Sequence, residues 1–403
     1  MPKNLYMYDL GFNGISYKGV CMDNAKKSTF KFHGFHKALL SVPLLFIVLL
    51  ASLFCILTVN AADPVYVSDE TTLRNAINDA VGPTVIALTA NIHLTNSTFI
   101  PLDKVITLTN DAGGPWKLFG PNNLDTIHVF GTLTLDGIIV THTVGTNGRG
   151  VMNAGKLFLV DGEISGNILT ANEGGGVFIV NDAIFTMQGG VISNNHSPIE
   201  GGGVNNEGTF IMQGGVISNN TAGNHGGGVR NFYREFNMSG GAIFNNTAIN
   251  GNGGGVYSVG NTHRFNLSGG LISNNTARNG GGVYISNGNM IASNSTIFGN
   301  TARGTGYGLG GGVYNGGGNF TLSTGAVFNN TATNNGGGVY NTGNFTLSAG
   351  TVSNNTATNG GGIYSTNLGS RFNLSGVGAV LDNIALCDGG GVYLPDFLAG
   401  FIH

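Results

Sequence analysis

A triplet of glycines followed by valine or isoleucine recurs nine times in this chain of 403 residues, and it constrains the fold more than any other feature. Successive triplets start 24 to 30 residues apart. A fixed period in this range is typical of solenoids, in which each unit buries its apolar side only against its neighbours. The triplets start at Gly174, Gly201, Gly226, Gly253, Gly280, Gly310, Gly336, Gly360 and Gly389, and a degenerate copy starts at Gly148.

Two shorter motifs recur between the triplets, and both have the spacing of β-strands. In one, phenylalanine precedes methionine or leucine by two positions; in the other, isoleucine or valine precedes asparagine by three. Side chains two apart share one face of a strand, so each repeat predicts three short strands separated by glycine and asparagine corners. We therefore expect an all-β parallel β-helix of ten or more coils, each of about 27 residues. The phenylalanines are Phe185, Phe210, Phe236, Phe265, Phe320, Phe345 and Phe372, and the asparagines are Asn167, Asn195, Asn220, Asn246, Asn275, Asn300, Asn330, Asn355 and Asn383.

Stacked coils place equivalent residues in columns along the axis. The valine after the triplet, the two apolar residues of the phenylalanine motif and the isoleucine are expected to form four inward columns. A lone coil cannot stabilise itself, because its apolar burial does not offset the conformational entropy of about 27 ordered residues. The motif asparagines are expected to form a ladder of amide hydrogen bonds, with His142 at its head.

The pairing of GGGVY with FTLSxGxVSNNTA resembles the right-handed parallel β-helix repeats of bacterial and archaeal adhesin-like surface proteins. It is also similar to the GGAI and FxxN repeats of chlamydial polymorphic outer membrane proteins, where residues 192–195 would take the FxxN role. The resemblance covers residues 65–403. It implies a right-handed coil and a role at the cell surface, and it implies no particular catalytic residue.

The first 61 residues have the pattern of an export signal rather than of the repeat. Four lysines between residues 26 and 37 precede an uncharged apolar run at residues 38–59, and small residues follow at Ala61 and Ala62. This pattern predicts a signal peptide or an uncleaved membrane anchor. Either places the repeats outside the cell, so the protein is expected to be secreted or displayed on the surface. Membrane contact is expected only through residues 38–59, if they are not removed.

Residues 62–143 precede the regular coils at 144–403 and are expected to form an N-terminal cap with irregular first coils. Leu73, Ala76 and Ile77 have helical spacing, and Ser68 or Asp69 is a suitable N-cap. A solenoid needs such a cap, because an open end exposes strand edges that pair between molecules.

Composition excludes several classes of function. Lys and Arg number 17 and Asp and Glu 20, a net charge of −3, which argues against a nucleic-acid partner. Of three cysteines, only Cys387 lies in the repeat region, so no disulfide framework or cysteine-based metal site is expected. We expect no cofactor.

The candidate binding residues are six tyrosines that follow the triplet's valine or isoleucine in successive coils. They must face outward if that residue faces inward. Stacked aromatics on neighbouring strands stabilise a sheet by about 0.2–1 kcal/mol per pair, which is one interpretation of the pattern. The other is an exposed aromatic stripe that binds a glycan or a protein on a host or neighbouring cell. The six are Tyr257, Tyr284, Tyr314, Tyr340, Tyr364 and Tyr393.

Two alternatives involve ionisable residues. Glu173, Glu200 and His225 directly precede successive triplets and are candidates for a cation site or for acid–base chemistry. A polysaccharide lyase or hydrolase of the pectate-lyase type would need clustered acids and a basic residue. The acids are scattered, and only Arg230 and Arg234 form a concentration of charge, near Glu235 and His225. We therefore expect a non-enzymatic rod with no catalytic residues, and keep the polysaccharide-degrading enzyme as the alternative.

Overall fold

The computed structural model describes residues 6–12, 15–21, 63–261, 264–304, 306–366 and 369–395. The chain divides into two compact units, Met1–Ala61 and Ala62–His403. In the first, β1 (Tyr6–Phe12) pairs antiparallel with β2 (Ile15–Cys21), a hairpin that the sequence analysis did not predict. The apolar run 38–59 lies outside the described residues. Within the described ranges, no helix has the length and apolarity needed to cross a bilayer.

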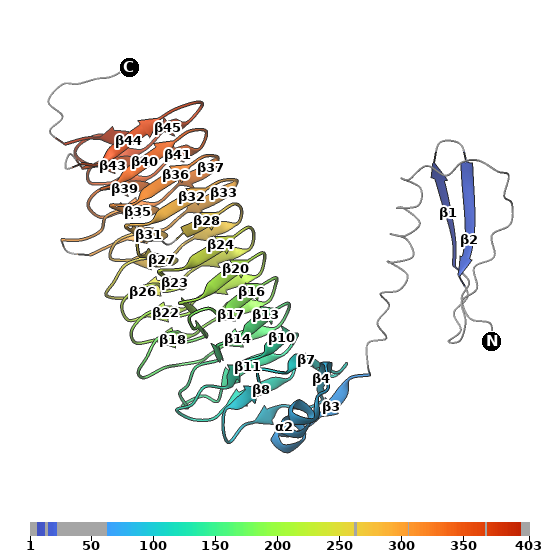
Figure 1. Ribbon diagram of the computed structural model, residues 1–403. Coiled ribbons are helices and arrows are strands. Elements are labelled where there is room, and N and C mark those ends of the chain that lie inside the picture. Colours follow the sequence, from blue (N-terminus) through green and yellow to red (C-terminus); the bar gives the residue numbers. More distant parts are fainter. Residues whose placement is uncertain are drawn as a thin grey trace. The chain divides into compact units, whose positions relative to one another are not determined.

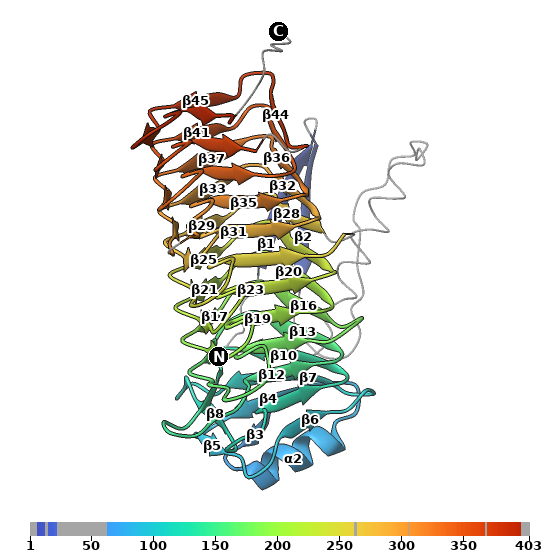
Figure 2. The same cartoon turned by 90° about the vertical axis from the view of Figure 1, so that its left-hand side faces the viewer.

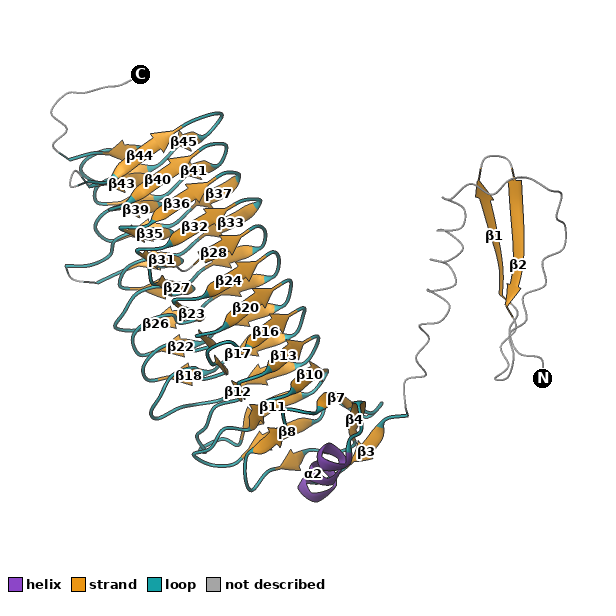
Figure 3. Ribbon diagram, in the orientation of Figure 1, coloured by secondary structure: helices purple, strands orange, loops and turns teal. Residues whose placement is uncertain are grey.

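The second unit is a right-handed parallel β-helix, as expected, and its coils stack into a rod (Figure 1). Strands alternate with loops in each coil, and helix α2 (Glu70–Asp79) lies at one end (Figure 3). Three sheets of 12 or 13 strands correspond to the three expected strands per coil. A fourth sheet of eight two-residue strands was not predicted.

The sheet formed by the phenylalanine motif, here called the Phe sheet, has 13 strands. Its motif phenylalanines are buried, except for Phe372 in the last coil, which is partly buried. The rings of Phe185, Phe210, Phe236 and Phe265 stack with centroids 4.7–5.0 Å apart. Its strands are β3 (Val65–Val67), β4 (Pro83–Leu88), β7 (Val105–Asn110), β10 (Thr132–Asp136), β13 (Lys156–Leu159), β16 (Ile184–Met187), β20 (Thr209–Met212), β24 (Glu235–Met238), β28 (Arg264–Leu267), β32 (Asn289–Ala292), β36 (Asn319–Leu322), β40 (Asn344–Leu347) and β44 (Arg371–Leu374).

The isoleucine motif forms the Ile sheet, and the residues after the triplets form the Tyr sheet; each has 12 strands. The Ile sheet comprises β5 (Ile92–His93), β8 (Lys117–Gly120), β11 (Ile139–His142), β14 (Glu163–Ser165), β17 (Val191–Ser193), β21 (Val216–Ser218), β25 (Ala242–Phe244), β29 (Leu271–Ser273), β33 (Ser295–Phe298), β37 (Gly325–Phe328), β41 (Thr351–Ser353) and β45 (Ala379–Leu381). The Tyr sheet comprises β6 (Thr98–Ile100), β9 (Ile127–Val129), β12 (Val151–Asn153), β15 (Val177–Ile179), β19 (Val204–Asn206), β23 (Val229–Phe232), β27 (Val256–Val259), β31 (Val283–Ser286), β35 (Val313–Gly316), β39 (Val339–Asn341), β43 (Ile363–Ser365) and β47 (Val392–Tyr393).

The fourth sheet, here called the Thr-Ala sheet, lies between the Ile sheet and the glycine triplet in eight of the coils. Threonine faces outward and alanine is buried in most of its strands. It comprises β18 (His196–Ser197), β22 (Thr221–Ala222), β26 (Thr247–Ala248), β30 (Thr276–Ala277), β34 (Thr301–Ala302), β38 (Thr331–Ala332), β42 (Thr356–Ala357) and β46 (Ile384–Ala385).

Equivalent residues stack rung on rung, as the repeat predicts. Val256 pairs with Val283, which pairs with Val313, and all three are fully buried. Figure 2 shows strands β19, β23, β31 and β35 of the Tyr sheet following one another along the rod. The register fixes which side chains share the outer face, and it therefore positions the candidate site.

The asparagine ladder is also present. From Asn167 to Asn383, each side-chain Nδ2 donates to the Oδ1 of the next motif asparagine at 2.9–3.0 Å. The same Oδ1 accepts a second hydrogen bond, from the backbone N–H of the preceding asparagine. His142 heads the column, with its Nδ1 2.8 Å from Asn167 Oδ1. The buried amides are therefore satisfied by one another along the axis.

The three positions of a triplet require glycine for different reasons. Gly253 has φ +68°, a left-handed conformation that favours glycine. A Cβ on Gly254 would lie 2.5 Å from the carbonyl oxygen of Gly281, and one on Gly255 would lie 2.7 Å from that of Gly282. The first glycine therefore serves the corner, and the other two allow neighbouring coils to approach.

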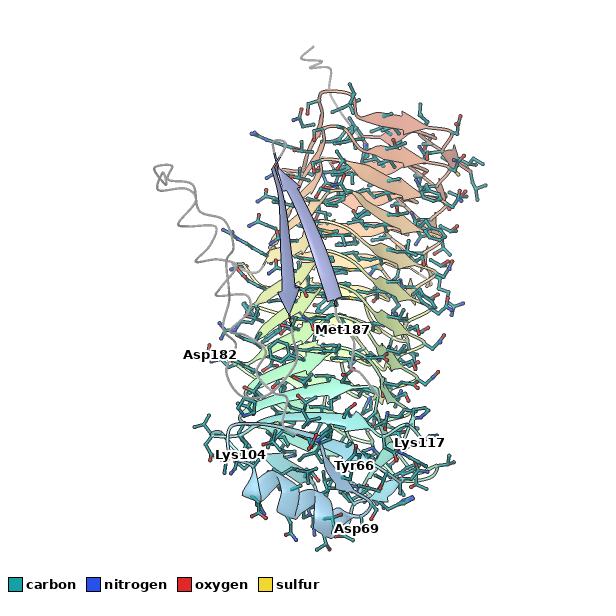
Figure 4. All side chains as sticks on the ribbon, turned by 90° about the vertical axis from the view of Figure 1, so that its right-hand side faces the viewer. Tyr66, Asp69, Lys104, Lys117, Asp182 and Met187 are labelled. Carbon is teal, nitrogen blue, oxygen red and sulfur yellow. The ribbon has the colours of Figure 1, made fainter. Side chains whose placement is uncertain are left out.

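Helix α2 covers the first coils, as predicted. Asp69 is its N-cap and forms a capping box with Thr72, while Leu73, Ala76 and Ile77 are buried. Figure 4 shows Asp69, Tyr66 and Lys104 at this end of the rod. Lys104 Nζ donates to the carbonyl oxygens of Asn78 and Ala80 at 2.8 and 2.9 Å, which caps the other end of the helix.

The last described coil is packed less tightly than the others. Leu374 is 52% exposed, whereas its neighbour Leu347 one coil earlier is fully buried. Ile384 is 58% exposed. Residues 396–403 lie outside the described residues.

Candidate functional site

The six predicted tyrosines form one continuous ladder on the outer face of the Tyr sheet. The register pairs each with the next, from Tyr257 to Tyr393. Their ring centroids are 4.4–5.3 Å apart. All six side chains are half-buried, while the valines or isoleucine beside them face the core. The rings therefore stack on one another, as both interpretations of the pattern require, and binding stays a prediction.

The orientation of the rings determines which of their atoms a ligand can reach. From Tyr257 to Tyr364, adjacent ring planes differ by only 10–29°. Each inner ring is therefore covered on both faces by its neighbours. A sugar ring cannot stack on these faces, and the ladder offers ring edges and a row of hydroxyl groups instead.

Packing also changes the acidity of the ladder. Burial, and then Tyr257, raises the pKa of Tyr284 to about 12, although its hydrogen bond with Tyr314 acts in the opposite direction. Burial, together with Tyr314 and Tyr364, raises the pKa of Tyr340 to about 12. The pKa of Tyr314 is raised further, by burial first and then by Tyr284, with which it shares a hydrogen bond. These hydroxyls are therefore neutral donors and acceptors over the whole physiological range.

His225 extends the ladder by one ring. Its imidazole lies 4.4 Å from the ring of Tyr257, with the planes 15° apart. Its Nδ1 accepts a hydrogen bond from the backbone N–H of Asn252 at 3.0 Å. Burial lowers the pKa of His225, and the charge of Arg230 lowers it further, so the imidazole is neutral at pH 7. Its 3.8 Å approach to Glu200 is therefore not an ion pair at that pH.

Beyond His225, the same face carries a cluster of three carboxylates around one guanidinium. Arg230 Nη1 lies 3.3 Å from Glu173 Oε2 and 3.1 Å from Glu207 Oε1, and Arg230 Nε contacts Glu200 Oε2. Arg230 is only 6% exposed. Burial raises the pKa of Glu173 and of Glu200; Arg230 opposes this, and the neighbouring glutamates add to it.

This cluster differs from the cation site that the sequence offered for these residues. Arg230 occupies the position where the predicted cation would bind between Glu173 and Glu200, so its guanidinium provides their positive partner. Among the described residues, no three His, Cys, Asp or Glu side chains are arranged to hold a metal ion. Arg234, the other arginine noted near Glu235 and His225, donates from Nε to the carbonyl oxygen of Glu207.

One regular contact explains why the sequence did not predict these partners. The residue before a triplet contacts the outward residue of the next coil, not of its own. Glu173 accepts from Asn205 at 3.0 Å, Glu200 contacts Arg230, and His225 stacks on Tyr257. The signal was present, since these pairs lie 30 to 32 residues apart, slightly more than one period.

A second polar cluster, near the cap, was not singled out in the sequence. Asp125 Oδ2 lies 3.0 Å from His128 Nε2 and 2.9 Å from Arg149 Nη1. Burial raises the pKa of Asp125, but His128 and Arg149 outweigh it, and the net shift is downward. An acid held ionised in this way links coils and is a poor proton donor.

Comparison with models of known protein families, with curated proteins and with solved structures finds no match for this chain. The β-helix is thus established by the geometry, and the adhesin-like resemblance depends on the sequence motifs alone.

Proposed function

We propose that this protein is a non-enzymatic rod at the cell surface or outside the cell, which binds a glycan or a protein through the tyrosine ladder. The observation that supports the proposal is the continuity of the ladder over six coils. Stacking alone would be served by phenylalanine, as in the buried column of the Phe sheet. The resemblance to adhesin-like and chlamydial surface repeats points to the same role.

The partner that suits this surface presents hydrogen-bonding groups at a repeat of about 5 Å. The hydroxyls are held on a rigid sheet, so little conformational entropy is lost when they bind. Sugar hydroxyls and the polar edge of a protein surface both meet this description. Binding is expected along the ring edges, because the ring faces are occupied.

Two sets of variants distinguish the contribution of the tyrosine hydroxyls to binding from that of the stacked rings. Tyr314→Phe, Tyr340→Phe and Tyr364→Phe, combined, retain the rings and remove three hydroxyls. The matching triple serine variant removes both. The protein and both variants are applied to an array of defined oligosaccharides and to intact cells. We expect binding by the natural chain and loss of binding in the phenylalanine variant; unchanged binding by that variant rejects the ladder as the site.

The cellular location belongs to the same proposal. Residues 38–59 act as a signal peptide or anchor and deliver the rod to the outside. Fractionation of the producing cells, with sequencing of the N-terminus of the exported protein, distinguishes cleavage near Ala61 from retention. Recovery of the repeats only in the cytosol contradicts the proposal.

A catalytic role is the alternative, and the acid cluster at Arg230 is the place to test it. Raised carboxylate pKa values are typical of general acids, but all three glutamates here contact one guanidinium. We therefore assign the cluster a structural role. Incubation with pectin and alginate, followed by assay for new reducing or unsaturated ends, tests this; product that disappears in a Glu200→Gln variant supports the enzyme.

A further inference from the structure

The charges in the second half of the rod are all of one sign over a long stretch. No aspartate or glutamate occurs between Glu235 and Asp382, whereas four arginines do: Arg264, Arg278, Arg303 and Arg371. Glu235 lies opposite Arg264 on the neighbouring strand, whereas the coils that carry Arg278 and Arg303 contain no acidic residue.

Two of these arginines lie on adjacent rungs of the same face. Arg278 follows Ala277 directly, Arg303 follows Ala302, and these two alanines are paired in the Thr-Ala sheet. The backbones at the two arginines are therefore about 4.8 Å apart. Like charges on adjacent strands repel each other. In other coils this position is uncharged: Pro198, Gly223, Ile249, Thr333, Thr358 and Leu386.

Neither guanidinium is neutralised within the described part of the chain. No ion pair or side-chain hydrogen bond of Arg278 or Arg303 occurs there. The one contact is a cation–π interaction, in which the guanidinium of Arg278 lies 5.2 Å from the ring centroid of Tyr307. Tyr307 is 45% exposed, and its carbonyl oxygen accepts a hydrogen bond from Asn334. This places an aromatic ring and an unpaired positive charge side by side at the surface.

The two arginines line a groove on the Thr-Ala sheet. The groove has a volume of about 290 Å³, and Thr247, Thr276 and Ile249 also line it. A second hollow, of about 570 Å³, shares Arg303 and continues to Thr333 and Asn334. Together they offer guanidinium groups, hydroxyls and short apolar side chains, and no acid.

We propose that this groove binds the anionic group of an acidic sugar, either a carboxylate or a sulfate ester. Paired guanidinium groups suit a planar or multi-oxygen anion. The threonines suit the sugar hydroxyls, and Ile249 with the alanine floor suits its C–H face. Two arginines are too few for a nucleic acid, whose phosphates call for a longer basic surface. The site lies on a different sheet from the tyrosine ladder and does not depend on the function proposed for it.

The test compares polymers that differ in charge, and variants that remove arginines either from the groove or from another face of the rod. Polygalacturonate carries carboxylates, dextran sulfate carries sulfates, and unmodified dextran carries neither. Binding of each to the full chain is measured by calorimetry, alongside a single-stranded DNA oligonucleotide. The variants are Arg278→Gln with Arg303→Gln, and Arg264→Gln as a control that removes an exposed arginine from the Phe sheet. Thermal unfolding verifies that each variant is folded.

We expect at least one charged polysaccharide to bind and unmodified dextran not to bind. The double variant is expected to weaken that binding by about a hundredfold or more, since each of the two lost contacts to a charged group is worth about tenfold or more in affinity. The control is expected to leave it unchanged. Preference for polygalacturonate or for dextran sulfate identifies the anion. Failure of both to bind, an equal loss in Arg264→Gln, or tighter binding of DNA would each overturn the assignment.

Discussion

The imidazole of His225 stacks on the phenol ring of Tyr257, 4.4 Å away and 15° from parallel, although the two residues belong to different positions of the repeat. His225 precedes its glycine triplet, and Tyr257 follows the next one. The contact joins two chemically distinct halves of one face. On one side lie uncharged tyrosines, and on the other lies the buried cluster of Arg230. A neutral imidazole separates them.

The raised pKa values of the ladder predict how stability responds to alkali. In the unfolded chain a tyrosine ionises near pH 10, whereas the pKa of Tyr284 and of Tyr340 is about 12 in the folded state. A group whose pKa is raised by folding contributes stability below its unfolded pKa and loses it as the pH rises through the folded pKa. We therefore expect the free energy of unfolding to fall between about pH 10 and 12. Absorbance at the phenolate band, followed with thermal unfolding, measures both effects.

The control for this prediction is Tyr284→Phe combined with Tyr340→Phe. It preserves the stacked rings and removes two ionising groups. Its stability is expected to decline less over the same interval than that of the natural chain. Identical alkaline profiles for the two proteins contradict the assignment of the effect to the ladder.

The third glycine of a triplet is expected to tolerate alanine in the last coil but not in an inner coil. Gly255→Ala places a Cβ 2.7 Å from the carbonyl oxygen of Gly282, so the coils must separate, at a cost of about 1–3 kcal/mol or more. Gly391 is the same position in the last triplet, and there the nearest atom to a Cβ is a methyl of Val380 at 3.7 Å. Gly391→Ala is therefore expected to be neutral or slightly stabilising. Chemical denaturation of both variants measures the difference, and a similar loss in each rejects the close-approach explanation.

Much of the architecture was predictable because every coil repeats the same sequence motifs. The inward columns, the cap helix with Asp69 and the asparagine ladder headed by His142 all follow from spacing. They depend on local strand geometry and on the stacking of like on like. The outward position of the six tyrosines follows from the same alternation.

The side-chain contacts of the candidate site were not predictable in the same way. They depend on which neighbouring coil each long side chain reaches, and the length of the repeat does not specify this. The sequence indicated that Arg230 lies near Glu235 and His225, but not that it pairs with Glu173, Glu200 and Glu207. The corner before each triplet shifts its residues toward the next coil, and the repeat alone does not give that shift. The Thr-Ala sheet was missed for a related reason, since a two-residue strand is too short to show alternation.

The acid cluster predicts that removing one carboxylate will not weaken the fold at neutral pH. Burial and repulsion by Glu200 and Glu207 raise the pKa of Glu173, so its ionised form is disfavoured in the folded state. Its contribution to stability is present at acid pH and is lost as the pH rises through the folded pKa. Glu173→Gln is therefore expected to keep or increase the unfolding temperature at pH 7 and to flatten its rise toward acid. Glu235→Gln, at an exposed glutamate outside the cluster, is the control; a marked loss of stability in Glu173→Gln alone at pH 7 contradicts the prediction.

Variants at two adjacent asparagines distinguish the contribution of the asparagine ladder to stability from that of the corner. Asn330 is fully buried and takes part in five hydrogen bonds of the ladder, three as donor through its N–H and amide and two as acceptor from Asn300. Asn330→Ala removes the acceptor of two Asn300 donors and the amide donor to the carbonyl oxygen of Ile297, at about 1–3 kcal/mol for each buried group left unpaired, while Asn355 Oδ1 keeps its bond from the backbone N–H of residue 330. Asn329 directly before it is exposed and has φ +53°, and Gly299 holds the same position one coil earlier. Asn329→Gly is therefore expected to change the free energy of unfolding by only a few tenths of a kcal/mol, since both residues tolerate that conformation. Denaturation of the two variants, with amide hydrogen exchange of the neighbouring coils, measures both effects; a ladder variant as stable as its corner partner would show that the amide column does not hold the coils together.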